Sequence, residues 1–273
     1  MRYKLLAGIA AGIIATLGVA VPAQAISPTT ANLYVLHAVP ATPVDVWVNG
    51  SVLLSNFQPG TLTDAQDLPA GDYTVVITAV GAPITTPVIG PVTLTLAANT
   101  SYTVVAHLDA SGNPTATLFT NDLSTIPAGQ GKLTVRHTAA APAVDILANG
   151  APAFTNLTNP NEVKANLPVG TISAAVALTG TTTPVIGPAD VAIQEGVNTI
   201  VYAWGSAEAG NLQLAVQTIG GLHSNPSGVN TGSAGLAADP NPAVIGVGVA
   251  SLLALMIVGG AATLRARKSR VGE

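Results

Sequence analysis

Apolar and polar residues alternate with a period of two along much of the chain between residues 26 and 222. Residues 33–38 and 73–80 are two such segments, and apolar residues occupy both of their alternating positions in places. Because successive side chains of a strand point to opposite faces of the sheet, this period predicts β-strands. Strands that are apolar on both faces are covered on both sides, which favours a β-sandwich over an open sheet.

Turn residues separate the predicted strands. The dipeptide Asn49-Gly50 stands between two of them, and a two-residue type I′ hairpin turn needs the positive φ that these residues tolerate. The strands predicted for this part of the chain are residues 33–38, 44–48, 51–55, 61–67, 73–80, 92–96, 102–108 and 115–120. Seven or eight strands in about 95 residues is the density of an immunoglobulin-like domain, and no segment of comparable length predicts a soluble helix.

The same pattern occurs twice, with a period of about 100 residues, which is the size of a domain and too long for a solenoid repeat. The first-copy segments that recur are His37, Asp45, Asn49-Gly50, residues 68–71 and residues 86–91; their second copies are His137, Asp145, Asn149-Gly150, residues 167–170 and residues 183–188. Prolines and glycines interrupt the pattern between residues 124 and 131. We therefore expect two tandem, immunoglobulin-like antiparallel β-sandwiches, at residues 26–125 and 126–222.

The two ends of the chain predict export and a membrane anchor. Residues 1–25 contain two basic residues, then an apolar run, then Ala23-Gln24-Ala25. This order predicts a signal peptide that is cleaved after Ala25. An uncleaved N-terminal anchor is the alternative. Residues 243–264 are 22 residues without a charge, long enough for a transmembrane helix, with a buried soluble helix as the alternative.

Residues 223–242 predict a flexible stalk, and the basic tail at residues 265–273 predicts a cytoplasmic C-terminus by the positive-inside rule. The protein is therefore expected to be a single-pass protein of the cell membrane with its main body outside the cell. The sortase motif Leu-Pro-x-Thr-Gly does not precede the apolar run, so we expect the anchor to stay intact.

Composition excludes several classes of function. Only 8% of the residues are charged, against about 25% in an ordinary globular protein. The basic residues between residues 26 and 242 are Lys132, Arg136 and Lys164, and this segment has twelve acidic residues, which gives a net charge of about −9. This acidic balance argues against nucleic acid as a partner. The chain has no cysteine, so it has no disulfide, thiol nucleophile or Cys-ligated metal site.

The duplicated polar pairs are His37 with Asp45 and His137 with Asp145. An imidazole and a carboxylate are groups used in metal sites and in general-base catalysis. Catalysis also needs a nucleophile or a third metal ligand, and none accompanies both pairs at comparable spacing. We therefore assign no catalytic, cofactor-binding or metal-binding residue, and expect the carboxylates to accept hydrogen bonds from the backbone or from the imidazole that close the loop. Metal binding or ligand recognition by the pairs is the alternative.

Residues 36–50, which read LHAVPATPVDVWVNG, resemble the bacterial family called domain of unknown function 4397, as do residues 57–60 and 68–73. In the second copy, residues 135–146 keep the His, Pro and Asp but carry Ala140 in place of a proline. Many family members carry glycine where Ala41 stands. The resemblance spans residues 32–221 and implies tandem extracellular β-domains of an actinobacterial surface type, but it implies no reaction.

These observations predict a non-enzymatic envelope component with a structural, adhesive or ligand-binding role and a glycan or protein partner in the envelope. A surface module that binds a metal or small ligand through the His/Asp pairs is the alternative. An enzyme such as a wall hydrolase would have to draw its two carboxylates from distant loops.

Overall fold

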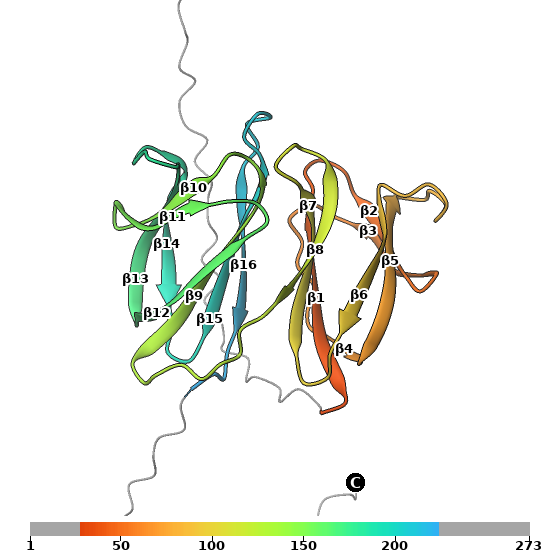
Figure 1. Ribbon diagram of the computed structural model, residues 1–273, viewed down its shortest axis with the longest axis horizontal. Coiled ribbons are helices and arrows are strands. Elements are labelled where there is room, and N and C mark those ends of the chain that lie inside the picture. Colours follow the sequence, from red (N-terminus) through yellow and green to blue (C-terminus); the bar gives the residue numbers. More distant parts are fainter. Residues whose placement is uncertain (1–27, 224–273) are drawn as a thin grey trace, which may run out of the picture. The chain divides into compact units, whose positions relative to one another are not determined.

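The computed structural model describes residues 28–223. These residues form sixteen β-strands and no α-helix (Figure 1). The predicted signal peptide, transmembrane helix and basic tail, and the stalk beyond residue 223, lie outside the described residues. Within the described residues, no helix is long and apolar enough to cross a membrane.

The first half of the described chain contains eight strands in two four-stranded sheets. The strands are β1 (Thr30–Ala38), β2 (Val44–Val48), β3 (Ser51–Phe57), β4 (Gln66–Pro69), β5 (Gly71–Ala79), β6 (Ile89–Leu96), β7 (Ser101–Leu108) and β8 (Pro114–Thr120). One sheet has the order β4-β1-β7-β8 and the other β3-β2-β5-β6. The second sheet pairs only antiparallel strands, whereas β1 runs parallel to β7 in the first.

The second half repeats this arrangement. Its strands are β9 (Gln130–Ala140), β10 (Val144–Ala148), β11 (Ala151–Leu157), β12 (Glu162–Pro168), β13 (Gly170–Leu178), β14 (Pro184–Ile193), β15 (Asn198–Ser206) and β16 (Gln213–Ile219). The sheet orders are β12-β9-β15-β16 and β11-β10-β13-β14, and β9 runs parallel to β15.

The all-β class and the antiparallel pairing of most strands are confirmed, and the sheets are consistent with sandwiches. The predicted hairpin turn is present, because Asn49 and Gly50 have φ of +49° and +82° between β2 and β3. The parallel pairs are a difference from the fully antiparallel expectation. Strands β1 and β7 are far apart in sequence, so their connection is long enough to let them run in the same direction.

Each half has its own apolar core. Leu33 and Val35 on β1 contribute to the first core together with Val46 and Ile77. The second core is built in the same way, from residues such as Leu133 and Ile146. On β1 these positions alternate along the strand and so lie on one face, as expected for a sheet that packs against another sheet.

A third apolar core joins the two halves. Its fully or nearly fully buried residues are Leu36, Ala38, Val105 and Phe119 from the first half and Ile200, Tyr202, Trp204 and Ile219 from the second. On β1, Leu36 and Ala38 alternate with the residues of the first core, so they lie on the opposite face of the strand. Strand β1 is apolar on both faces. The second half of the chain covers the face that points away from the first core.

A glycine of the first half lies against Trp204 of the second half. Gly60 follows β3 with φ of +79°, and a Cβ atom at this position would lie 3.2 Å from the ring of Trp204. A side chain at residue 60 would therefore push on the indole as well as strain the backbone.

The third core predicts the cost of a truncation. Leu36→Ala should lower the free energy of unfolding by about 2–5 kcal/mol, because it leaves a cavity in a fully buried contact between the halves. Leu53→Ala, on a side chain that is 41% exposed, is the matched control and should change it by less than about 0.5 kcal/mol. Urea denaturation measures both, and equal effects of the two substitutions would contradict the buried contact.

Candidate functional site

Each predicted histidine lies near the end of a long strand and closes the loop that follows it. The Nε2 atom of His37 donates a hydrogen bond to the carbonyl oxygen of Thr42 over 2.8 Å, and its Nδ1 accepts one from the backbone N–H of Val39 over 3.4 Å. Both ring nitrogens therefore bind the backbone of the loop between β1 and β2, which fixes one neutral tautomer of the imidazole. The ring also stacks against Phe57, with 5.9 Å between centroids.

The second copy makes the same bonds. The Nε2 atom of His137 donates to the carbonyl oxygen of Pro142 over 3.1 Å, and the N–H of Ala139 donates to Nδ1 over 3.3 Å.

The first loop contains one residue with unusual backbone geometry, Ala41, whose φ of +66° lies in the left-handed region that favours glycine.

The two aspartates hold three segments together in each half. One oxygen of Asp45 on β2 accepts a hydrogen bond from the N–H of Asn56 on β3, and the other from the N–H of Gly81 beyond β5, both over 2.8 Å. Asp145 accepts from the N–H groups of Asn156 and Gly180 over 2.8 and 2.9 Å. The carboxylate replaces strand pairing where β3 or β11 is irregular, as the register shifts of these strands show.

The histidine and the aspartate of a pair do not bind each other. Among the described residues, no hydrogen bond joins His37 to Asp45 or His137 to Asp145, because each group binds backbone atoms instead. The described part of the chain also has no group of three or more His, Cys, Asp or Glu residues that could hold a metal ion. The bonds that these four side chains make to the backbone fasten the loops and strands around them.

The environment of these groups shifts their pKa values. Hydrogen bonds from backbone amides lower the pKa of Asp45 and Asp145, because they stabilise the carboxylate. Burial lowers the pKa of His37 and His137, and the bond to a backbone carbonyl opposes that effect only in part. The two histidines are therefore held in the neutral form that their hydrogen bonds require.

Sequence analysis missed a third buried histidine. His107 on β7 donates from Nδ1 to the carbonyl oxygen of Leu108 over 2.8 Å and accepts from the hydroxyl of Thr117 through Nε2 over 2.9 Å. Burial lowers its pKa as well. It has no counterpart in the sequence repeat, so the comparison of the two copies could not single it out.

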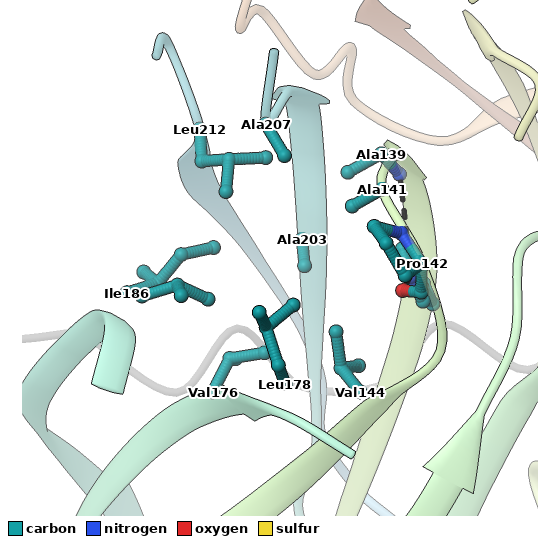
Figure 2. A pocket seen from close by; sticks show the side chains of 12 residues that line it. Ala139, Ala141, Pro142, Val144, Val176, Leu178, Ile186, Ala203, Ala207 and Leu212 are labelled. Atoms are coloured by element: carbon teal, nitrogen blue, oxygen red, sulfur yellow. Dashed lines mark hydrogen bonds between the residues drawn. The ribbon is translucent and has the colours of Figure 1, made fainter. Parts of the chain in front are cut away.

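An apolar cavity of about 340 Å³ lies beside His137 in the second half. Figure 2 shows the side chains that surround it, which come from the ends of β9, β13 and β15, from the starts of β10 and β14 and from the loops next to them. The inner part of the lining includes Ala139, Val144 and Ala203 beside the imidazole. The sequence gives no direct sign of a cavity, because a cavity depends on how side chains of two sheets fit together.

Fold and site together define an all-β protein of paired four-stranded sheets, in which the duplicated polar pairs fasten loops and strands. Residues 31–147 match the family described as domain of unknown function (DUF4397), a span that runs from β1 into β10. The predicted resemblance to this family is confirmed over that span. No curated protein is similar enough to the chain to count as a match.

The hydrogen bonds of the aspartates predict the effect of removing their charge. Asp45→Asn and Asp145→Asn should each lower the urea midpoint of unfolding, because one oxygen that accepts a backbone N–H becomes an amide donor. The exposed Asp190→Asn is the control and should leave the midpoint unchanged. The double variant Asp45→Asn, Asp145→Asn tests the metal alternative. If zinc or calcium raises the melting temperature of the wild type and the double variant loses that rise, the metal alternative is supported instead.

The buried histidines predict a loss of stability on acidification. Their pKa values are lowered in the folded state, so below about pH 6.5 the unfolded chain binds protons that the folded chain does not. The free energy of unfolding should fall between pH 7 and pH 4.5, by up to about 1.4 kcal/mol per pH unit for each histidine. The aspartates, whose pKa values are lowered from 3.8, lose their contribution only at lower pH.

Denaturation curves across this range measure the effect. His37→Gln should make the slope of stability against pH shallower, because it removes one of the groups whose pKa is lowered on folding. Constant or rising stability between pH 7 and pH 4.5 would contradict the neutral, buried state of the rings.

Proposed function

We propose that the protein is a non-enzymatic component of the cell envelope, held in the membrane by residues 243–264, with a structural or adhesive role outside the cell. In this proposal residues 26–125 and 126–222 are two immunoglobulin-like domains that act as one rigid body on a stalk. The contact between the halves is the observation that carries the proposal. Interfaces between domains usually permit relative motion unless they are large and apolar.

A buried guanidinium strengthens this contact. Arg136 on β9 is 1% exposed, and its Nε donates to Glu162 over 2.8 Å. One terminal nitrogen donates to Asn121 of the first half over 3.1 Å and to the hydroxyl of Tyr202 over 2.7 Å. The cation also lies 4.5 Å from the centre of the Phe119 ring, which belongs to the first half.

Further polar bonds connect the halves around this centre. The hydroxyl of Thr103 donates to Gln217 over 3.0 Å, and the side-chain amide of Asn159 donates to the carbonyl oxygen of Leu108 over 2.8 Å. Lys132 pairs with Asp122 over 2.8 Å, next to the connection between the halves. A contact that is apolar at its centre and pinned by directional bonds resists bending, which suits a protein that transmits force or holds a partner at a distance.

The location is supported by the sequence. The apolar run at residues 243–264 and the basic tail after it fit a single-pass anchor with an external body. The acidic balance of the body keeps it soluble and discourages adsorption to anionic lipid. The binding surface for an envelope glycan or protein would then lie on the outer sheets, β3-β2-β5-β6 and β11-β10-β13-β14. The inner sheets, β4-β1-β7-β8 and β12-β9-β15-β16, cover each other.

Protease treatment of intact cells tests the arrangement. Proteinase K should remove the body of the protein and leave a small membrane-bound fragment that contains residues 243–264. A variant that ends at residue 242 should be released into the medium, which makes it the matched control. Full protection of the body in intact cells, or retention of the truncated variant in the membrane, would contradict the proposal.

A further inference from the structure

We propose that the cavity beside His137 binds an uncharged hydrocarbon group, either a small apolar molecule or the apolar end of a larger one. The inference does not rest on the membrane anchor or on the proposed envelope role. At about 340 Å³ the cavity is in the range of small-molecule sites in proteins. It is about twice the volume of an apolar cavity that takes up benzene, so a fused pair of aromatic rings is a ligand of suitable size.

The chemistry of the lining selects against charged ligands. No side chain that lines the cavity is charged, and His137 is the one that can form hydrogen bonds. Both of its ring nitrogens are already used by the loop backbone, over 3.1 and 3.3 Å. None of the buried polar side-chain atoms that lack a partner in the described chain belongs to a lining residue. A ligand therefore finds apolar contact here and no partner for a charge.

The cavity has a buried floor and an exposed apolar rim. Ala139, Val176 and Ala203 on the floor are buried, whereas Leu178 and Val185 at the rim are 39% and 44% exposed. These two are among the large apolar side chains most exposed to solvent in the described chain. A hydrocarbon group that enters the cavity would cover both, which adds apolar burial to the contacts of the floor.

The first half has larger residues at two of the floor positions. Val39 corresponds to Ala139, because each donates its N–H to Nδ1 of the loop histidine. Ile77 corresponds to Val176, because they lie opposite Val46 and Ile146 in the same register. The second half thus carries a smaller side chain at both positions, which leaves space in the floor beside its histidine.

Naphthalene is the probe for this site. The full chain is reconstituted in phosphatidylcholine nanodiscs, and the fluorescence of bound naphthalene is titrated with the signal of empty nanodiscs subtracted. We expect saturable binding by the wild type. The double variant Ala139→Val, Val176→Ile, which installs residues that the first half already accommodates, should weaken binding at least tenfold.

Three comparisons complete the experiment. Ala151→Val with Val169→Ile makes the same changes at exposed positions away from the cavity and should bind like the wild type. Leu178→Asp places a charge at the exposed rim without disturbing the floor and should also weaken binding. Naphthalene-2-sulfonate, a charged relative of the probe, should bind at least tenfold more weakly than naphthalene.

Melting curves of each variant establish that it is folded. If the wild type shows no saturable binding, or if the filled and rim variants both bind as the wild type does, the proposal is wrong. Equal affinity for naphthalene and its sulfonate would overturn the assignment of the ligand as uncharged.

Discussion

Each inner sheet of this protein must be covered on both of its faces. One face of β4-β1-β7-β8 packs on the first core, and the other carries Leu36, Val105 and Phe119, which would be exposed if the halves separated. The sheet β12-β9-β15-β16 is in the same situation, since Ile200 and Tyr202 lie on the face that points away from the second core. The two sheets satisfy this requirement by covering each other. The hydrophobic effect therefore acts on the pair of halves as well as on each half alone.

The contact between the halves also buries a charged group, Arg136. Burying a guanidinium has a large desolvation cost, which its hydrogen bonds and its partner carboxylate offset only when the geometry is good. Arg136 meets this condition through Glu162, Asn121 and Tyr202. The equivalent position of the first half is Leu36, so the contact is asymmetric even though the halves are copies. We infer that this asymmetry fixes one way of docking the halves.

Much of the fold could be predicted from the sequence. The period of two located most strands, and Asn49-Gly50 located a hairpin turn that the backbone angles of these residues support. Apolar residues on both faces of residues 33–38 indicated strands covered on both sides, but not what covers the second face. That information resides in long-range packing, because the second-half residues of the third core, such as Ile200 and Tyr202, lie more than 150 residues from Leu36 in the chain.

The candidate site could be predicted only in part. The duplication singled out His37, Asp45 and their copies, yet the aspartate partners are backbone N–H groups, and any residue but proline can supply such a donor. The residues that bind each carboxylate therefore leave no side-chain signature in the sequence. The cavity beside His137 was hidden for another reason, since a cavity depends on how side chains from different strands and loops fit together.

Differential scanning calorimetry of the protein tests the central claim that the two halves form one body. If the third core joins them, the described region unfolds in a single transition whose calorimetric enthalpy equals its van't Hoff enthalpy. Two resolved transitions, each with the enthalpy of about half of the chain, would show that the halves unfold independently and would contradict the claim.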